Sequence, residues 1–311
     1  MSLRLKCAMG LLGVCASAGV ISARPTVGPD VVVSGVGSEF LKFGTRDVGV
    51  PGSPKMVTGY AVASTACNIG DMPAIWIDAT NQHPVIGQQM YRLFHGRFEQ
   101  IGMSWLKHSF CAADSPSCTN LVPGSVSPPP DQSCATLGLF MNDTYSGSLN
   151  GQQYFLGPRS EVNPATGVFA YPFTLGWNLA GDCLYKRLQL ATSDLSPANY
   201  PGARYFCEVS YITSDESSAV RFNNASYREV LVGSLTSGPL TGGCTPSPPG
   251  YNLSFTGGLA PFKAAIEAWK AIDPQVALVY ADVPGDGRVA VGARATALGG
   301  GEWAYEYAVY N

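Results

Sequence analysis

The stretch QQMYRLFHGRFEQIGMSWL, from Gln88 to Leu106, reads as two strands joined by a tight turn. Aromatic and apolar residues lie on both sides of a central His-Gly pair. A two-residue hairpin turn requires a left-handed backbone, which glycine adopts without steric penalty. We therefore predict a β-hairpin whose turn runs from Phe94 to Arg97, with Gly96 in the left-handed position.

Short strand signals recur on both sides of this hairpin. The chain has 311 residues with 36 Gly and 23 Pro, a composition that favours many turns over long helices. The pattern predicts a mainly β protein: an antiparallel immunoglobulin-like β-sandwich with one short helix and a C-terminal β-hairpin. The other strand signals are DVVVSGVG (30–37), GYAVASTACNIGD (59–71), ARYFCEVSYIT (203–213) and SYREVLVGSL (226–235).

The composition also limits the class of partner. Apolar residues make up 46% of the chain, enough for a sizeable core, whereas charged residues make up only 13%. The net charge of −3 creates no basic field that would attract a phosphate backbone. We therefore expect no nucleic acid among the partners of this protein.

The first 23 residues have the features of a secretory signal peptide. Arg4 and Lys6 form a cationic start, residues 7–20 are an apolar run, and plausible cleavage sites end at Ala18 and at Ala23. A short membrane anchor is the alternative, although the run is too short to span a bilayer comfortably. We expect a secreted or cell-surface protein with no membrane span in the mature chain.

Seven cysteines remain after cleavage of that peptide. In an oxidising compartment most of them are expected to pair, and the odd number leaves one free or paired elsewhere. The most local candidate bridge joins Cys111 to Cys118. The chain has no C-x-x-C and only three histidines, which excludes a zinc finger. The seven are Cys67, Cys111, Cys118, Cys134, Cys183, Cys207 and Cys244.

Segments rich in proline and glycine divide the mature chain. We predict a β-sandwich domain over residues 24–237, a Pro/Gly-rich linker over 238–260, and a helix followed by further β structure over 261–311. The stretch APFKAAIEAWKAIDP (260–274) predicts the helix, because its apolar residues recur near a 3.6-residue spacing and Pro274 ends it.

The last 27 residues of this region, GDGRVAVGARATALGGGEWAYEYAVYN (285–311), read as two strands joined by a glycine triplet. In the second strand Trp303, Tyr305 and Tyr307 alternate with smaller or charged residues. Two strands cannot bury a sheet alone. Either they add to the first domain or the chain is a fragment of something longer, and we favour the fragment.

The segment SWLKHSFC (104–111) places Lys107 beside His108. Neighbouring residues on a strand point to opposite faces of a sheet. The two side chains are therefore not expected to act on one substrate atom. Taken alone, the spacing indicates a solvated Lys107 and a buried, hydrogen-bonded His108.

A wider order of motifs includes the same lysine. His83 is followed by MYRL and a glycine turn, then by Lys107-His108-Ser109-Phe110-Cys111, and later by Asp143-Thr144-Tyr145. In this order the sequence resembles the catalytic domain of the lysyl oxidases, which are secreted copper amine oxidases. The resemblance implies a lysyl-oxidase-like strand order over roughly residues 29–232. It also places Lys107 and Tyr145 at the lysine and tyrosine that cross-link into the family's lysine tyrosylquinone cofactor.

Two further stretches resemble uncharacterised secreted proteins of planctomycete-type bacteria. They are RFEQIGMSWLKH (97–108) and LGPRSEVNPATGVFAYP (156–172). This resemblance implies no activity.

The chain departs from the lysyl oxidases at the copper ligands. That family binds copper through a His-x-His-x-His cluster, whereas the matching stretch here, DATNQHPVIG (78–87), keeps only His83. Copper(II) prefers several nitrogen ligands. The other histidines of the chain are His95 and His108, so His83, His95 and His108 are the candidate copper ligands.

Two functions follow. The first, which the missing histidines favour, is a non-catalytic extracellular binding or structural module without a cofactor, whose partner is an extracellular protein or polymer. The second is a copper- and quinone-dependent amine oxidase that uses Lys107 and Tyr145. In the second, the cofactors are copper and lysine tyrosylquinone.

A last pair of charged residues is a candidate substrate-binding site. Arg159 and Glu161 lie two residues apart and would share a face of a strand. A solvated ion pair is the ordinary interpretation, and a substrate clamp is the sharper one. Asp282 and Asp286 lack the pattern of a calcium-binding loop, so we interpret that segment as a turn.

Overall fold

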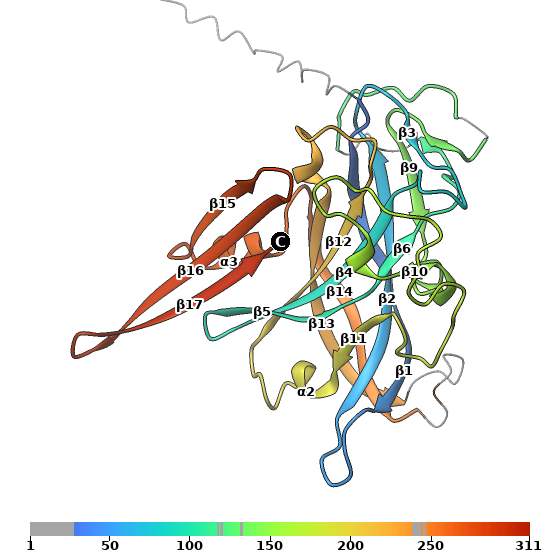
Figure 1. Ribbon diagram of the computed structural model, residues 1–311. Helices are drawn as coiled ribbons and strands as arrows, with labels where there is room; N and C mark the ends of the chain where they lie inside the picture. The colour runs from blue at the N-terminus through green and yellow to red at the C-terminus, as the bar shows by residue number, and fades with distance from the viewer. Residues whose placement is uncertain (1–27, 117, 119–120, 131–132, 238–243, 245–246) are drawn as a thin grey trace, which may run out of the picture.

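The computed structural model describes residues 28–311 except 117, 119–120, 131–132, 238–243 and 245–246, so the predicted signal peptide lies outside the described residues. The protein is mainly β, with antiparallel sheets and few helices, as predicted (Figure 1). Its strands are β1 (Val31–Asp47), β2 (Met56–Asn68), β3 (Ala74–Ile75), β4 (Val85–Phe94), β5 (Arg97–Met103), β6 (Leu106–His108), β7 (Ser115–Pro116), β8 (Thr136–Leu137), β9 (Met141–Tyr145), β10 (Leu156–Gly157), β11 (Leu188–Ala191), β12 (Arg204–Ile212), β13 (Ala225–Ser237), β14 (Pro249–Ala260), β15 (Ala277–Val283), β16 (Gly287–Gly299) and β17 (Glu302–Tyr310). Its helical segments are α1 (Gly147–Asn150), η2 (Gln153–Phe155), η3 (Arg159–Glu161), α2 (Thr192–Leu195), η4 (Arg221–Asn223) and α3 (Ile266–Ile272).

Two antiparallel sheets form the body of the molecule. The first has the strand order β1-β2-β9-β7, with β11 also paired to β2. The second has the order β10-β6-β4-β12-β13-β14, with β5 also paired to β4. Strands β4 and β12 lie at the centre of the second sheet and pair over nine residues, from Val85↔Ile212 to Leu93↔Arg204.

The predicted hairpin is present as β4 and β5. Phe94 pairs with Arg97 across the turn, and both turn residues have a left-handed backbone, with φ of 48° at His95 and 79° at Gly96. Gly96 therefore has the left-handed backbone that the sequence predicted. The turn therefore follows from the local sequence alone.

The main core lies between the two sheets. It is built from alternate residues of β2 and β9 on one side and of β4 and β12 on the other, and its fully buried members include Val62, Met90, Val209 and Tyr211. Burial of each such side chain contributes about 1.5–3 kcal/mol to folding. Gln88, also on the inner face of β4, is held by hydrogen bonds with the backbone of Val62 at 2.8 and 3.0 Å.

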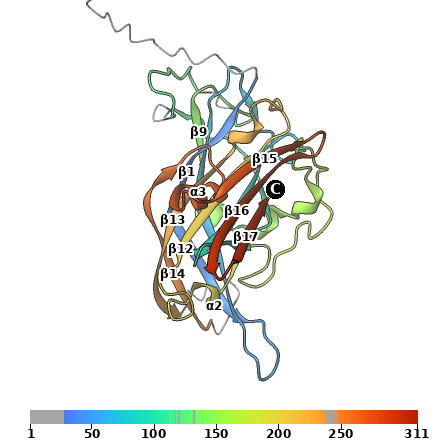
Figure 2. The ribbon, with the colours of Figure 1, turned by 90° about the vertical axis from the view of Figure 1, so that its left-hand side faces the viewer.

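The C-terminal region docks on the outer face of the second sheet. Figures 1 and 2 show the three-stranded sheet β15-β16-β17 and α3 beside β5, β12 and β13. Trp269 of α3 is fully buried and stacks on Phe98 of β5, with ring centroids 6.2 Å apart. A second hydrophobic cluster joins these residues to Tyr91, Phe206 and Ala290. The predicted strands therefore belong to a sheet that buries its face against the first domain.

Two boundaries differ from the sequence prediction. Residues 249–260, which we placed in the linker, form β14 and pair with β13 over Val230↔Phe255 and neighbouring positions. The helix begins at Ile266 rather than near residue 260, because the backbone turns at Phe262, where φ is 61°. Most of residues 238–248 lie outside the described residues. Strand β15 has no counterpart among the predicted strands.

The cysteine pairing also differs from the prediction. Three disulfides link Cys67 to Cys118, Cys111 to Cys134, and Cys183 to Cys244, so the expected local bridge between Cys111 and Cys118 is wrong. The fold brings Cys118 to the end of β2, close to Cys67, and nearness in sequence did not decide the pairing. Among the described cysteines, Cys207 is free, as the odd number required.

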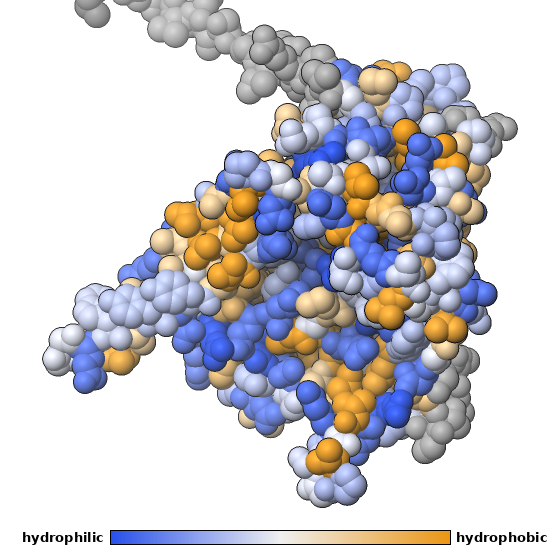
Figure 3. Space-filling view, viewed as in Figure 1, coloured by the Kyte–Doolittle hydropathy of each residue, from blue (hydrophilic) through white to orange (hydrophobic). Residues whose placement is uncertain are grey.

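The outer face of the C-terminal sheet is exposed. Trp303, Tyr305 and Tyr307 are 55%, 59% and 64% exposed, and they alternate along β17 as predicted. Figure 3 shows pale and orange residues gathered on this arm of the molecule. Across the described part of the chain, no helix is long and apolar enough to cross a membrane.

Candidate functional site

The segment SWLKHSFC contributes β6 to the second sheet. Lys107 pairs with Ile86 of β4 and with Leu156 of β10, and His108 pairs with Val85. The two side chains enter different surroundings, as the alternation predicted. Both are buried, with exposed fractions of 1% and 2%, so the interpretation of Lys107 as a solvated lysine is wrong.

Lys107 lies in an aromatic enclosure. Its Nζ is 4.3 Å from the ring centroid of Phe110, 4.7 Å from that of Phe155 and 5.1 Å from that of Tyr145. The ammonium group donates a hydrogen bond to the carbonyl of His108 at 2.6 Å. Burial lowers the pKa of Lys107 to about 7, against the opposing effect of Asp78 and Asp143.

Tyr145 closes one side of this enclosure from β9. Its hydroxyl accepts hydrogen bonds from Trp76 Nε1 at 3.0 Å and from the amide of Phe110 at 3.1 Å, and it donates to the carbonyl of Cys111 at 3.2 Å. The residue is 2% exposed, and burial raises the pKa of its hydroxyl. The fold thus brings together the two residues that the resemblance pairs, although nothing in the geometry establishes a bond between them.

Asp143 is a member of the same cluster that sequence reasoning did not single out. It lies two residues before Tyr145 on β9, and its carboxylate accepts a hydrogen bond from the amide of Ala113 at 2.8 Å. Burial raises its pKa to about 6. The alternation of strand residues could have found it, because Asp143 and Tyr145 share a face. We call Lys107, Asp143, Tyr145, Phe110 and Phe155 the closed centre.

Two of the three histidines meet behind the closed centre. His83 Nε2 and His108 Nδ1 are 3.0 Å apart, and His83 Nδ1 lies 3.2 Å from the carbonyl of Ile77. Burial lowers their pKa values to about 4 and about 3, so both rings are neutral at pH 7. Aromatic rings surround the pair, at Phe169, Tyr171 and Phe173.

The third histidine is not part of this group. His95 is exposed at the β4–β5 turn and stacks on Phe94, whereas His83 precedes the first residue of β4. A ten-residue strand spans roughly 30 Å, so the predicted three-histidine copper site does not form. Among the described residues, no group of three His, Cys, Asp or Glu could hold a metal. Two imidazoles bonded to each other do not fit the several nitrogen ligands that copper(II) prefers.

Arg159 and Glu161 do not share a face of a strand as predicted. They lie in the 3-10 helix η3 rather than on a strand, and they have different partners. The Glu161 carboxylate binds the amide and hydroxyl of Thr174 and the amide of Leu175, at 2.5–2.9 Å. Arg159 instead donates to the carbonyls of Ser104 and Gln88.

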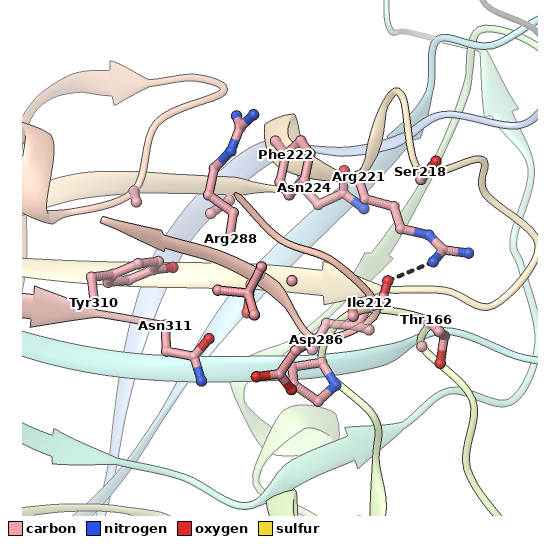
Figure 4. Close-up of a pocket in the computed structure, with 18 of the residues that line it drawn as sticks. Thr166, Ile212, Ser218, Arg221, Phe222, Asn224, Asp286, Arg288, Tyr310 and Asn311 are labelled. Atoms are coloured by element: carbon pink, nitrogen blue, oxygen red, sulfur yellow. Dashed lines mark hydrogen bonds between the residues drawn. The ribbon is translucent and has the colours of Figure 1, made fainter. Parts of the chain in front are cut away.

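Arg159 borders a cavity that we call the open cavity. The cavity has a volume of about 780 Å³ and lies between the second sheet and the C-terminal sheet. In Figure 4, Ile212, Phe222, Arg288 and Tyr310 lie around it. Sequence reasoning missed these residues and Gln89, since β12, η4, β16 and β17 meet only in the folded chain. The signal for Gln89 was a Gln-Gln pair inside a strand, which places an amide on each face.

No family model, no curated protein and no solved structure matches the chain.

Proposed function

We propose that the protein is a secreted, non-catalytic binding module built on an immunoglobulin-like β-sandwich with a lysyl-oxidase-like strand order. The observation that carries the proposal is the closure of the centre where amine oxidation would occur. Lys107 and Tyr145 are 1% and 2% exposed, and their polar atoms are bonded to the backbone or to Trp76. An amine substrate has no path to either residue without rearrangement of the aromatic enclosure.

Two further observations support this proposal. Three disulfides are compatible with an extracellular protein, because such bonds persist in oxidising compartments. The open cavity offers a place for a ligand on the other side of the second sheet. Its volume is within the range of about 300–1,000 Å³ that is typical of small-molecule sites.

The second candidate, a quinone-dependent amine oxidase, is favoured by one observation. Lys107 Nζ lies 5.1 Å from the ring centroid of Tyr145, close enough that a modest movement would bring the amine to the ring. The histidines do not supply the matching copper ligands, and so we place this candidate second.

One preparation separates the two candidates. The mature protein is expressed with copper in the medium, its bound metal is measured, and the denatured chain is tested with a quinone redox-cycling stain. We expect neither stoichiometric copper nor staining. Mass spectrometry of proteolytic peptides is expected to recover the Lys107 and Tyr145 peptides separately.

Two matched variants make the result interpretable. Lys107→Met removes the amine that a quinone cross-link needs, and Tyr145→Phe removes the phenol. Both substitutions change the shape of the side chain little. A stain present in the natural protein and lost in both variants, with a cross-linked peptide, would establish the oxidase and overturn the non-catalytic module. Faint staining that persists in both variants is background and leaves the proposal standing.

A further inference from the structure

The floor of the open cavity is the outer face of the second sheet. Gly87 and Gln89 of β4 pair with Ser210 and Glu208 of β12, and these four residues point away from the core that Met90 and its neighbours fill. The C-terminal sheet covers the Glu208 end of this face, where Tyr310 donates a hydrogen bond to Glu208 at 3.0 Å. At the other end, the side chains of Ser210, Arg159 and Leu106 cover Gly87 and line the cavity themselves.

Arg159 brings a positive charge to the cavity. Its guanidinium lies over Gly87, where a Cβ atom would come within 3.1 Å of Nη2. It donates through Nε to the carbonyl of Ser104 at 2.7 Å and through Nη2 to that of Gln88 at 3.4 Å. These bonds use two of its five N–H donors. No ion pair in the described part of the chain joins Arg159 to a carboxylate.

The nearest buried acid does not satisfy Arg159. Glu208 acts on it electrostatically, but one Glu208 oxygen accepts from Tyr310 and the other accepts from the amide of Ala265 at 2.5 Å. Glu216, which also borders the cavity, is held by the amide of Val31 and the side chain of Asn224. Burial raises the pKa of Glu216 to about 8, so it is largely neutral at pH 7.

Gln89 adds an unfilled acceptor beside this charge. The residue is only 7% exposed and lines the cavity, yet its Oε1 has no hydrogen-bond partner among the described residues. A buried carbonyl oxygen without a partner costs about 1–3 kcal/mol. The atom is covered by its neighbours in this structure, so a ligand that donates a hydrogen bond would reach it after a rotation of the Gln89 side chain toward the cavity.

The rim of the cavity carries charges of both signs, because Asp282, Asp286 and Glu267 line it together with Arg221 and Arg288. Arg288 stacks on Phe222 at 3.7 Å and pairs with Asp282 at 2.6 Å, as the approach of Arg288 and Phe222 in Figure 4 illustrates. Arg221 donates to backbone carbonyls, including that of Ala165 at 2.5 Å. The cavity therefore combines an unneutralised cation on its floor with a free acceptor, and aromatic surface at its edge.

We propose that the open cavity binds a small hydroxy-carboxylate of the acidic-sugar class. Arg159 receives the carboxylate, and Gln89 Oε1 accepts a hydrogen bond from a neighbouring hydroxyl group. Phe222 and Tyr310 flank the carbon skeleton. This inference rests on the proposed function as a binding module, and it names the kind of ligand.

Titration calorimetry of the full chain with three matched compounds tests it. D-glucuronate carries both features, D-glucose lacks the carboxylate, and cyclohexanecarboxylate lacks the hydroxyl groups. We expect glucuronate to bind at least ten times more tightly than either of the other two. Equal affinity for all three compounds, or no binding of glucuronate, overturns the proposal.

Variants assign the preference to the two residues. Arg159→Gln is expected to remove the preference for glucuronate over glucose. Gln89→Met is expected to remove the preference over cyclohexanecarboxylate while thermal stability holds or rises, because the variant deletes an unsatisfied acceptor. Arg46→Gln, at an exposed arginine that pairs with Asp182, is the control and is expected to bind as the natural protein does.

The outcomes remain decisive if one variant does not fold. If Arg159→Gln is unfolded, Gln89→Met decides alone, and unchanged selectivity in that variant contradicts the proposal. If Arg46→Gln loses as much affinity for glucuronate as Arg159→Gln does, the proposal is also contradicted. A positive quinone stain overturns the non-catalytic role without affecting carboxylate binding, so the two proposals fail separately.

Discussion

Lys107 lies on β6 and Arg159 on η3, against opposite faces of the second sheet, and the two cations differ in their surroundings. Each donates to backbone carbonyls, and neither has an ion-pair partner among the described residues. Aromatic rings close over Lys107, whereas Arg159 borders a cavity of about 780 Å³. A perturbed charge is often a sign of a functional site. Lys107 is fully buried and Arg159 only partly, so access to the cavity distinguishes a ligand site from a structural one here.

The largest expected effect comes from opening the closed centre. Tyr145→Ala removes a fully buried ring and leaves the indole N–H of Trp76 and the amide of Phe110 without their acceptor. We expect a loss of about 3–5 kcal/mol in the free energy of unfolding, typical of large-to-alanine changes in a core. Urea denaturation at pH 7 measures it. A loss below about 1 kcal/mol would show that the centre is not tightly packed.

Stability as a function of pH distinguishes the buried lysine from a solvated one. Between the folded pKa of about 7 and the ordinary value of 10.5, the unfolded chain holds a proton that the native chain has released, so the native state gains stability as pH rises. Each unit of pKa difference corresponds to about 1.4 kcal/mol. Compared with Lys107→Met, the natural protein is therefore expected to gain a few kcal/mol from pH 6 to pH 10.

The comparison with Lys107→Met isolates this one group. Glu208 and Glu216 have raised pKa values of about 7 and about 8, and they lower the stability of both proteins as pH rises through that range. Their contributions cancel in the difference between the two unfolding free energies. A difference that stays flat from pH 6 to pH 10 would mean that Lys107 titrates like a solvated lysine.

The same substitution, made beside the buried histidine pair and beside Arg159, extends the contrast between packed and open surroundings. In Gly157→Ala the new Cβ would lie 2.5 Å from His108 Nε2 and 2.9 Å from Phe173, whose rings are stacked on each other. In Gly87→Ala the nearest atoms are the ends of the Ser210, Arg159 and Leu106 side chains, at 2.9–3.3 Å. We expect a loss of about 1–3 kcal/mol for the first and within about 1 kcal/mol for the second.

Chemical denaturation of the two alanine variants measures this contrast. Gly87→Ala should also weaken glucuronate binding, because the Arg159 guanidinium must move. If Gly87→Ala proves the more destabilising, the space around Arg159 is as tightly filled as that around His108.

The smallest effect is expected at Glu161. Its carboxylate is bonded to Thr174 and Leu175 away from the cavity floor, so Glu161→Gln should change the unfolding free energy by about 1 kcal/mol or less. Glucuronate affinity should not change. A tenfold loss of affinity would restore the idea that Arg159 and Glu161 act together.

Local patterns in the sequence predicted individual turns and strands. Long-range contacts decided which cysteines pair. The Phe94–Arg97 turn and the alternation of Trp303, Tyr305 and Tyr307 depend on near neighbours, and both were predicted. The bridge from Cys67 to Cys118 depends on how β2 meets a distant loop, so spacing could not reveal it.

The candidate sites also depend on long-range contacts that local sequence patterns do not reveal. Only the resemblance to a family suggested that Lys107 lies beside Tyr145, because alternation assigns a face to a residue without naming what packs on that face. The open cavity was not predicted, since Gln89, Arg159 and Tyr310 come from separate parts of the chain and meet only after the C-terminal sheet has docked.

Among the described cysteines, Cys207 is the one outside the disulfides, and its reactivity reports on motions of the core. Cys207 lies on β12 in the core between the sheets, fully buried, and burial raises the pKa of its thiol. A thiol reagent attacks the thiolate, so the folded protein reacts only while this part of the core is exposed to water. The labelling rate at Cys207 therefore reports how often the two sheets separate, without any substitution in the chain.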